Sequence, residues 1–412
     1  MADRINIIKH PIVTGIVQSL PSSKSLSNRA LIIQALLQGG GTLENLSSAQ
    51  DTRLMQLLLS TKEHVINVMD AGTTMRFLTA YFGVTGQTKM LTGTARMLER
   101  PIQPLVNALR TIGVDIEYAG KLGFPPVLIR GFHGQLSDRV AIQGDVSSQF
   151  ISALMLVAPS LPQGLVIELM GKVGSRPYLV MTAELMRHFG SQPEITENEI
   201  RVRPGDYSPA RYTVEPDWSA ASYWFSVAAL AESADIFLPN VSSSSVQGDL
   251  VIVTIMEKLG VRSNFETAGL RLTNLGIRTE KLVWNFSDCP DLAQTVLPAC
   301  AALGIPGEFV GLESLRIKET DRIFALQQEL KKLNAQLTQE ASRWILTPGK
   351  LPTEGILINT YHDHRMAMGF APLATRMDIS IESPKVVDKS YPGFWEDMKG
   401  LGFQPPPTPS FK

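Results

Sequence analysis

A unit of about 70 residues recurs along this chain and constrains its fold more than any other feature of the sequence. Five segments share one pattern: an Asp, then small or polar residues, then an apolar run with helical spacing. They begin at Asp70, Asp145, Asp217, Asp291 and Asp363, at intervals of 75, 72, 74 and 72 residues. An Asp in this place can accept hydrogen bonds from the free N–H groups of a first helical turn. We therefore expect five helices whose N-termini these residues cap.

A second series of amphipathic helices alternates with the first. Each is expected to end where a Gly or Asn supplies the positive φ of a C-terminal cap, at Gly113, Gly190, Gly260, Asn334 and Gly402. Short runs rich in β-forming residues lie between the helices, at 127–130, 139–142, 234–238, 282–286 and 355–359. Each unit thus predicts two helices and several strands. About six units fill the chain, the first opened by 22–25.

The predicted fold class is α/β, with the units grouped into globular domains rather than stacked in a rod. The chain's 412 residues, 44% hydrophobic and 19% charged, suffice for two or three domains. Its most apolar stretch, 150–170, is interrupted by Pro159, Pro162 and Gly164, so it predicts a buried helix, a turn and a strand rather than a membrane span. The alternative is an ordinary α/β protein whose caps recur by coincidence, and the near-equal spacings argue against it.

The charge balance argues against a nucleic acid or a membrane surface as partner. With 38 Lys and Arg against 39 Asp and Glu, the net charge is −1, so any cationic site is local. The two cysteines, Cys289 and Cys300, cannot form a disulfide framework and lack the spacing of a structural zinc site. No export or transit signal is visible near the first residue. We expect a protein of the reducing cytoplasm.

Several common catalytic motifs are absent from the sequence. There is no Walker A motif, no Gly-x-Gly-x-x-Gly after a predicted strand, and no Gly-x-Ser-x-Gly. Instead, hydroxyl, amide and cationic side chains gather at predicted helix starts, where free N–H groups and the helix macrodipole attract anions. Three such starts are 24–29, 72–76 and 147–149. Each alone is consistent with a plain cap, but together they predict a multi-pronged site for small phosphorylated ligands.

Other charged segments have two interpretations each. The run 318–322 opens a helix, either as part of the anion site or as a solvated start with Glu319 and Arg322 paired at i,i+3. The run 362–365 suggests a metal, but adjacent ligands on one helix start have poor geometry, so we expect no metal. Arg96 and Lys389 lie near Gly or Pro and are either ligand-binding cations or surface charges.

At these residues the sequence resembles the 5-enolpyruvylshikimate-3-phosphate (EPSP) synthase family. The resemblance runs from about Pro21 to Phe394 and rests on nine segments in family order. They are 23–30, 71–76, 96–102, 144–150, 175–178, 290–291, 316–322, 363–368 and 389–394. One such match could arise by chance, whereas nine in order are highly specific.

The resemblance implies two similar globular domains, each of three βαβαββ units in an inverted α/β barrel-like fold, with a ligand cleft between them. In the family the chain starts in one domain, crosses to build the other, and returns. The expected crossings here are 18–21 and 214–217, each with a Pro next to a helix start. The inserted domain is then 19–215, and 1–18 with 216–412 form the discontinuous one.

The resemblance also implies an activity. The family transfers the enolpyruvyl group of phosphoenolpyruvate to the 5-hydroxyl of shikimate 3-phosphate and releases phosphate, by addition and elimination through a tetrahedral intermediate. The family belongs to aromatic amino acid biosynthesis, and its enzymes are the target of glyphosate. The methylene must be protonated and the attacking hydroxyl deprotonated, so an acid and a base are needed. Two phosphates and two carboxylates also demand many fixed cations. We expect no cofactor, and a monomer with these two substrates as its only partners.

Roles carry over from the family residue by residue. Asp291 resembles the base, and Glu319 and Lys24 resemble the residues that handle protons around the intermediate. The shikimate 3-phosphate set is Lys24, Ser25, Arg29, Ser147, Ser148, Gln149, Ser175, Asp291, Ser314 and Lys318. The phosphoenolpyruvate set is Lys24, Gly72, Arg96, Gln149, Arg322, Arg365 and Lys389. Arg76, Tyr178 and His364 are secondary candidates.

The sequence departs from the family at three positions. Asp70 stands where many members have Asn, Phe77 where many have Pro, and Ser314 where many have an Asn that contacts shikimate 3-phosphate. Phe77 follows the Gly72 helix start, a region that tunes glyphosate against phosphoenolpyruvate in the family. Ser314 is shorter than Asn, so a polar contact is lost or made through water.

Two alternatives differ in what they require of the sequence. The sister enolpyruvyl transferases that act on UDP-N-acetylglucosamine carry a Cys in a mobile loop. In this chain the corresponding segment, 96–101, contains no Cys, and both cysteines lie far from it. A non-catalytic sensor of phosphorylated ligands would predict loss of Asp291, Glu319 or Lys24, and all three are present.

Overall fold

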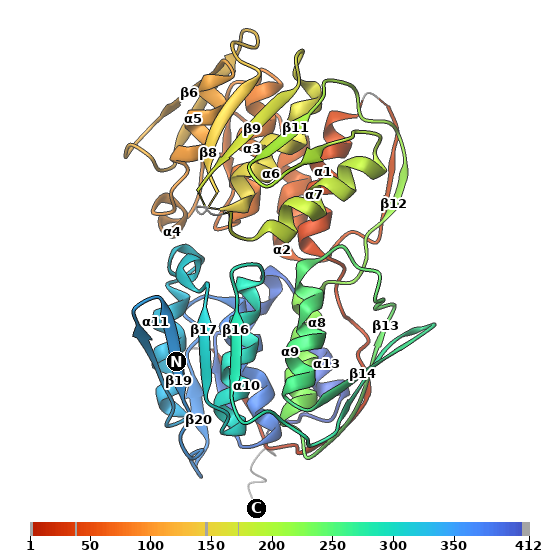
Figure 1. Ribbon diagram of the computed structural model, residues 1–412, viewed down its shortest axis with the longest axis vertical. Helices are drawn as coiled ribbons and strands as arrows, with labels where there is room; N and C mark the ends of the chain where they lie inside the picture. The colour runs from red at the N-terminus through yellow and green to blue at the C-terminus, as the bar shows by residue number, and fades with distance from the viewer. Residues whose placement is uncertain (1–2, 38, 145–146, 172, 406–412) are drawn as a thin grey trace, which may run out of the picture. The chain divides into compact units, whose positions relative to one another are not determined.

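The computed structural model describes residues 3–37, 39–144, 147–171 and 173–405. The chain divides into two compact units (Figure 1). We call Ser22–Val214 the inserted unit, and the chain up to Pro21 together with that from Glu215 onward the terminal unit. Asp145, one of the five predicted helix caps, lies outside the described residues.

The inserted unit contains seven α-helices and ten strands among its described residues. In chain order they are α1 (Lys24–Leu36), β3 (Thr42–Glu44), α2 (Gln50–Ser60), β4 (Val65–Asn67), α3 (Gly72–Val84), β5 (Lys89–Thr92), α4 (Ala95–Leu98), α5 (Gln103–Thr111), β6 (Val114–Tyr118), β7 (Val127–Phe132), β8 (Arg139–Gln143), α6 (Ser148–Val157), β9 (Leu165–Met170), α7 (Arg176–His188), β10 (Glu194–Ile195), β11 (Glu199–Val202) and β12 (Arg211–Thr213). The stretch 150–170 is a helix, a Pro-Gly turn and a strand, as predicted.

The terminal unit begins with two N-terminal strands and continues after the inserted unit. Its strands and α-helices are β1 (Arg4–Ile7), β2 (Ile12–Ile16), α8 (Trp218–Leu230), β13 (Ser233–Pro239), α9 (Ile252–Lys258), β14 (Val261–Glu266), β15 (Gly269–Asn274), β16 (Leu282–Asn285), α10 (Ala293–Leu303), β17 (Gly307–Val310), α11 (Arg322–Lys332), β18 (Gln336–Glu340), β19 (Arg343–Thr347), β20 (Ile356–Ile358), α12 (His364–Phe370), β21 (Ile379–Glu382) and α13 (Phe394–Gly400). Short 3₁₀ helices include η2 (Gly248–Val251), η3 (Pro290–Leu292), η4 (Glu313–Ile317) and η6 (Pro384–Lys389).

The predicted repeat is visible in the strand order of the sheets. Three stretches are complete βαβαββ units, and their sheets have the orders β4-β5-β7-β6, β8-β9-β11-β10 and β16-β17-β19-β18. In each, the first pair is parallel and the last two strands form an antiparallel hairpin. The sheet β2-β13-β15-β14 has the same order, with β2 supplied by the N-terminal segment.

The two remaining units are also completed from distant parts of the chain. Strand β1 pairs antiparallel with β21, which pairs parallel with β20, and β3 pairs with β12. Each compact unit therefore holds three repeats, which confirms the predicted α/β fold of two domains with three units each. The sheets are open in the described part of the chain, so no closed barrel forms there.

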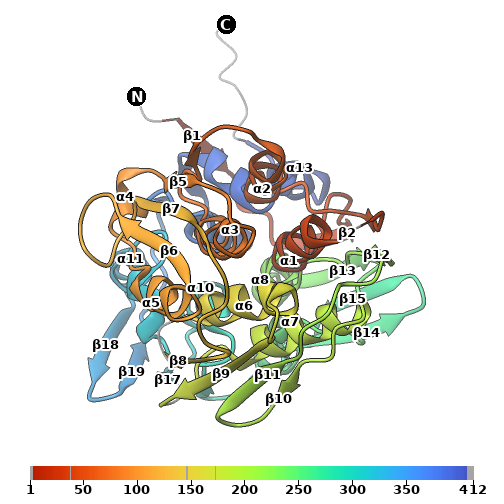
Figure 2. The same cartoon turned by 90° about the horizontal axis from the view of Figure 1, so that it is seen from above.

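The first predicted series of helices forms the interior of each unit. In the inserted unit, α1, α3 and α6 lie in the middle, with strands of the sheets around them (Figure 2). In the terminal unit, α8, α10 and α12 are buried along almost their whole length. Helices α6, α8 and α10 are apolar on nearly every side, whereas α5 and α11 of the second series are amphipathic because one face meets water.

The predicted helix starts are partly correct. Asp217 accepts a hydrogen bond from the Ala220 N–H at 2.9 Å, and Asp363 accepts one from the Arg365 N–H at 2.9 Å, so both caps are confirmed. Two predicted caps are wrong: Ala71, not Asp70, is the N-cap of α3, and Asp291 lies within η3, ahead of α10. The Asp291 carboxylate binds arginines instead of backbone N–H groups, as described below.

All five predicted helix ends are confirmed. Gly113, Gly190, Gly260, Asn334 and Gly402 have φ of 106°, 89°, 92°, 57° and 99°. Local backbone geometry decides these positions, because a C-terminal cap needs a positive φ wherever the helix packs. No helix in the described part of the chain combines the length and apolarity that crossing a membrane requires.

The end of α13 offers a test of this assignment with a built-in control. Gly402 has φ of 99°, and a Cβ added there would lie 2.4 Å from His10 Nε2, whereas a Cβ on Gly400 would meet nothing within 4 Å. Gly402→Ala should therefore lower the free energy of unfolding by about 1 kcal/mol or more. Gly400→Ala should be neutral or stabilising, since Ala favours helix by about 0.5–1 kcal/mol. Urea unfolding midpoints of the two variants check this, and equal midpoints would contradict it.

Candidate functional site

A buried guanidinium organises the charged residues of the terminal unit. Arg322, the first residue of α11, is 1% exposed. Its Nε donates to Asp363 Oδ2 at 2.7 Å, its Nη1 to Asp291 Oδ1 at 2.8 Å and its Nη2 to Glu319 Oε2 at 2.8 Å. Burial alone would lower the pKa of Arg322, but the three carboxylates outweigh it and raise this pKa. Arg322 and these partners form what we call the Arg322 cluster.

Three further predicted cations lie at the Arg322 cluster. Arg365, at the start of α12, places Nη2 2.9 Å from Asp291 Oδ2. Lys318 Nζ lies 3.6 Å from Asp291 Oδ1, and Lys389 Nζ, at the end of η6, lies 4.0 Å from Glu319 Oε1. Between 291 and 389 the predicted catalytic and binding sets contain seven residues, and the structure brings six of them together. The seventh, Ser314, is half-buried in η4.

The Asp291 carboxylate is held in its ionised form. Burial alone would raise its pKa, but Arg365, Lys318 and Arg322 outweigh burial and hold the pKa well below the usual range. Asp291 therefore accepts hydrogen bonds from two guanidinium groups, as the carboxylate of a ligand could. The cations of this cluster thus contact an acid of the protein itself.

Two of these segments, 318–322 and 362–365, had an alternative interpretation. The i,i+3 pair of Glu319 and Arg322 exists at 2.8 Å, but Arg322 is buried, so the helix start is not the solvated one of that alternative. Within the ranges that the structure describes, no three His, Cys, Asp or Glu residues gather closely enough to hold a metal ion.

Helix α1 carries the predicted cations of the inserted unit. Lys24 Nζ lies 3.0 Å from Asp51 Oδ2, and both side chains are largely buried. Arg29 is 2% exposed, and its guanidinium donates to Thr182 Oγ1 at 2.7 Å, the Ser25 carbonyl at 2.9 Å and Ser152 Oγ at 3.2 Å. These partners are all neutral, and burial lowers the pKa of Arg29 to about 10. A buried cation with neutral partners favours binding of an anion.

A cation that was not predicted lies beside Gly72. A Cβ added to Gly72, at the start of α3, would lie 2.6 Å from Arg100 Nη2, and Arg100 Nη1 donates to the Asp70 carbonyl at 3.2 Å. Arg100 is 5% exposed. Arg96 pairs with the exposed Glu99 at 3.2 Å. Arg100 was not among the predicted site residues, although it is the second Arg of the same 96–101 segment.

Two helix starts of the inserted unit lie next to each other. Ser147 caps α6 by accepting from the Gln149 N–H, and Gln149 Nε2 donates to Thr73 Oγ1 at 3.1 Å, in the first turn of α3. Their free N–H groups therefore converge. Ser148 is buried in the same turn.

Ser175 precedes α7 with a positive φ of 55°. A non-glycine residue in this region is strained, and such strain concentrates at ligand sites. Of the secondary candidates, Arg76 donates to the Gly72 carbonyl at 3.0 Å and the Pro101 carbonyl at 3.3 Å, so it braces the turn beside Gly72. Tyr178 is half-buried and His364 is buried.

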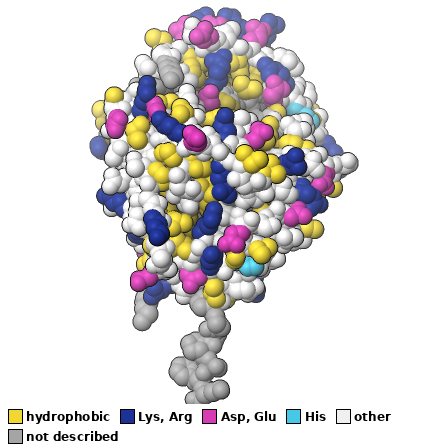
Figure 3. Space-filling view, turned by 60° about the horizontal axis from the view of Figure 1, so that its bottom comes forward, with side chains coloured by type: hydrophobic (Ala, Val, Ile, Leu, Met, Phe, Trp, Pro, Cys, Tyr) yellow, Lys and Arg dark blue, Asp and Glu magenta, His cyan; other side chains and the backbone are white. Residues whose placement is uncertain are grey.

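The surface and the cysteines also limit what the chain can do. On the face drawn in Figure 3, Lys and Arg side chains are interspersed with Asp and Glu rather than gathered into one broad basic field. Cys289 and Cys300 are unpaired and buried. Burial raises the pKa of Cys289 to about 12, so its thiol is not a nucleophile near neutral pH.

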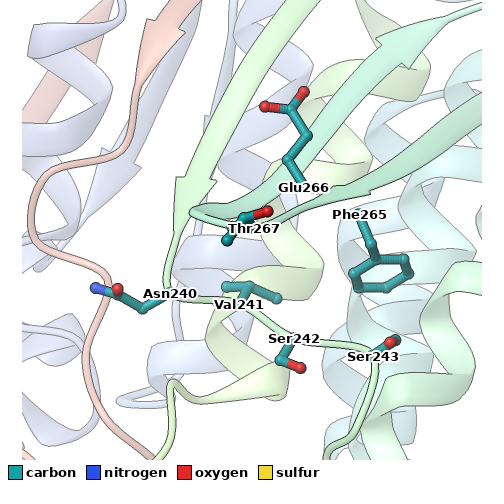
Figure 4. Close-up of a pocket in the computed structure, with 8 residues that line it drawn as sticks. Asn240, Val241, Ser242, Ser243, Phe265, Glu266 and Thr267 are labelled. Carbon is teal, nitrogen blue, oxygen red and sulfur yellow. The ribbon is translucent and has the colours of Figure 1, made fainter.

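A hollow of about 300 Å³ lies elsewhere in the terminal unit, beside the turn between β14 and β15 (Figure 4). None of its eight lining residues is Lys or Arg, and Glu266 at its edge already accepts a hydrogen bond from Arg271 at 2.8 Å. It therefore lacks the groups that an anionic ligand requires.

Comparison with known proteins identifies relatives along nearly the whole chain. The family model described as EPSP synthase (3-phosphoshikimate 1-carboxyvinyltransferase) matches residues 9–61 and 56–398. A 3-phosphoshikimate 1-carboxyvinyltransferase of Bacteroides fragilis is 46% identical over 388 residues, covering 93% of this chain and 94% of the relative. One from Methanospirillum hungatei is 34% identical over 417 residues, with 93% and 95% covered.

Solved structures show the same fold at lower identity. An EPSP synthase from Acinetobacter baumannii superposes with a TM-score of 0.77 at 22% identity, over 97% of this chain and 98% of that one. An enolpyruvyl transferase from Streptomyces tendae gives 0.74 at 12% identity, over 98% of each. At these identities the likeness concerns the fold alone.

The Arg322 cluster predicts a large, pH-dependent effect on stability. Arg322→Met would leave the buried Asp363 and the partly buried Asp291 and Glu319 without their shared cation, and should lower the free energy of unfolding by about 3–5 kcal/mol near neutral pH. The pKa of Asp291 is depressed in the folded protein, so its stabilisation exists above the unfolded pKa and is lost as pH falls. The deficit of the variant should therefore shrink on acidification.

The matched control for this variant is Arg316→Met. Arg316 is exposed and lies 3.5 Å from Asp321, so its removal should change stability little at any pH. Urea unfolding of both variants at several pH values provides the measurement, and a pH-independent deficit for Arg322→Met would contradict the assignment.

Proposed function

Because this chain belongs to the EPSP synthase family, we propose that its two charged regions bind the substrates and move the protons of the family's reaction. The chain transfers the enolpyruvyl group of phosphoenolpyruvate to the 5-hydroxyl of shikimate 3-phosphate and releases phosphate, in the shikimate pathway. The observation that carries the residue assignment is the Arg322 cluster, in which the proposed base and the proposed carboxylate-binding arginines share hydrogen bonds.

Arg322 and Arg365 bind the carboxylate of phosphoenolpyruvate in this proposal. Planar guanidinium groups suit a carboxylate, since each can offer two parallel N–H donors. These guanidinium groups donate hydrogen bonds to Asp291, whose pKa they depress. An arriving carboxylate competes for the same donors, so the pKa of Asp291 rises when the ligand binds.

Asp291 is then the base that removes the 5-hydroxyl proton. A strongly depressed pKa would make a poor base, so loosening the Asp291 contacts with Arg322 and Arg365 increases its basicity at the moment it is needed. Lys318 Nζ, 3.6 Å from Asp291, keeps a positive charge beside the ionised form and binds the acceptor substrate.

Glu319 and Lys24 handle the protons around the tetrahedral intermediate. Glu319 lies 4.0 Å from Lys389, which in the proposal binds the phosphate of phosphoenolpyruvate. Lys24 contacts both substrates, and its pairing with Asp51 fixes the ammonium group. Addition places a proton on the methylene carbon, and elimination removes a proton from the same carbon. We assign these proton transfers to Glu319 and Lys24.

The remaining polar residues bind the phosphates and the ring. Shikimate 3-phosphate is bound by Ser25, Arg29, Ser147, Ser148, Gln149, Ser175, Ser314 and Lys318. The phosphate of phosphoenolpyruvate is bound by Gly72 N–H, Arg96, Gln149 and Lys389. Arg100, a buried cation beside Gly72, is added to this set.

The proposal extends to the state of the protein. It acts as a cytoplasmic monomer, with no nucleic acid or membrane among its partners. Two buried, unpaired cysteines fit a reducing compartment, and a net charge of −1 does not favour a polyanion. The reaction needs no cofactor, since proton transfer and charge stabilisation come from side chains.

The acceptor is tested by phosphate release from phosphoenolpyruvate. We expect release with shikimate 3-phosphate and none with UDP-N-acetylglucosamine or without acceptor. The sister transferases use a loop Cys, and both cysteines here are buried, with raised pKa values. Release with the UDP sugar would contradict the assigned acceptor. Silence with both acceptors, from folded protein, would favour the non-catalytic sensor.

The roles of Arg100 and Arg96 are tested by substituting each in turn. Losing one charge-assisted hydrogen bond costs about 1.5–3 kcal/mol, so Arg100→Ala and Arg96→Ala should each raise KM for phosphoenolpyruvate by about 10-fold or more. Arg130→Ala is the control: it breaks an exposed ion pair with Glu117 and should leave this KM within about twofold. Steady-state kinetics with saturating shikimate 3-phosphate provide the measurement, and an unchanged KM for Arg100→Ala would remove Arg100 from the binding set.

A further inference from the structure

A buried carboxylate outside the proposed catalytic and binding sets lies behind the Arg322 cluster. Asp249, in η2, is 4% exposed. Its Oδ2 accepts a short hydrogen bond from Ser219 Oγ, and its Oδ1 is buried with no hydrogen-bond partner among the described residues. A buried carboxylate oxygen without a partner is costly when charged. These surroundings therefore favour the protonated form of Asp249.

Ser219 connects Asp249 to the proposed substrate-binding arginine. Its Oγ lies 3.4 Å from Arg365 Nη2, and the same nitrogen lies 2.9 Å from Asp291 Oδ2. One hydroxyl group thus separates Asp249 from the guanidinium that we assign to the carboxylate of phosphoenolpyruvate. At this range, in a buried site, a unit charge strongly affects its neighbours.

The surroundings of Asp249 place its titration near neutral pH. Burial raises its pKa, and the nearby Asp291 raises it further, whereas Arg365 and the Ser219 hydroxyl lower it, for a value of about 6. The charged or titratable groups that face it belong to three packed elements. They are Asp217 of the α8 start, Asp291 of η3 with the neighbouring Cys289, and Arg365 of α12.

We propose that Asp249 is a positioning residue whose protonation, acting through Ser219, controls how strongly Arg365 binds the carboxylate of phosphoenolpyruvate. The proposal rests on the function proposed above. With Asp249 ionised, its charge offsets part of the charge of Arg365 and repels an arriving anion. With Asp249 protonated, that repulsion is removed, so substrate binding and proton uptake at Asp249 favour each other.

The sign of the pH dependence follows from this coupling. As pH rises through the titration of Asp249, the carboxylate becomes charged and anion binding at Arg365 weakens. KM for phosphoenolpyruvate should rise, whereas kcat should change less, because Asp249 touches no reacting atom. Asp249→Asn keeps the shape but stays neutral, so it should lack this rise.

The experiment compares pH profiles of KM and kcat for phosphoenolpyruvate with saturating shikimate 3-phosphate. Between about pH 5.5 and about pH 8, KM of the unaltered protein should rise about 10-fold more than that of Asp249→Asn. The phosphate of the substrate titrates in the same window for every variant, so the comparison between variants removes its effect. Parallel profiles of the two proteins would overturn the proposal.

Asp288→Asn is the matched control. It removes one acidic charge from an exposed position of the same unit, so its profile should follow that of the unaltered protein. If Asp288→Asn also lost the rise of KM with pH, the effect would be a general one of charge, and the proposal would be overturned.

Ser219→Ala provides a second, independent variant. The Ser219 hydroxyl lowers the pKa of Asp249, so its removal should move the inflection of the KM profile to higher pH. Should Asp249→Asn fail to fold, as judged by circular dichroism, this variant decides alone. An inflection unmoved by Ser219→Ala would then reject the coupling.

A measurement without substrate separates this proposal from the proposed function. The pKa of Asp249 is raised in the folded protein, so the folded state holds an extra proton between about pH 4 and about pH 6, and stability falls as pH rises through this window. Asp249→Asn should lack that fall in its urea unfolding midpoint. If Asp249→Asn lacks this fall in stability but the unaltered protein shows no turnover, the proposed function is rejected and the titration of Asp249 is kept. If Asp249→Asn shows the same fall as the unaltered protein, the titration of Asp249 is rejected.

Discussion

The terminal unit depends on the buried guanidinium of Arg322. Removing a charged group from water costs several kcal/mol, and only complete pairing with good geometry offsets that cost. Here three carboxylates, from η3, from the turn before α11 and from the cap of α12, satisfy the three guanidinium nitrogens. One side chain thereby fixes the starts of three helices to one point. The pairing of Arg322 is therefore complete within the protein itself.

The two units treat their buried cations in opposite ways. Arg29 of the inserted unit binds hydroxyl and carbonyl oxygens, and no carboxylate offsets its charge among the partners described. An anion that reaches Arg29 adds a charge pair without breaking one, whereas an anion at Arg322 or Arg365 must displace Asp291. The first arrangement favours tight binding, and the second links binding to a change in the basicity of Asp291.

The sequence predicted the features that local chemistry determines. A positive φ at a helix end depends on a few adjacent residues, so Gly113 and Asn334 could be identified without the fold. The repeat period followed from similar local signals. Helix caps were less predictable, because an Asp has two uses at a helix start: Asp217 caps, whereas Asp291 pairs with arginines that come from 31 and 74 residues further along the chain. Asp249 was out of reach, since its burial and its single hydroxyl partner are tertiary features.

The departures from the family pattern can now be explained in part by contacts. Arg100 donates to the backbone carbonyl of Asp70, so that contact is the same whether the side chain is Asp or Asn. Phe77 is fully buried, with the Arg29 guanidinium 5.3 Å from its ring centre. A ring face stabilises a desolvated cation, which a Pro at this position could not do. The Phe therefore stabilises the buried guanidinium of Arg29.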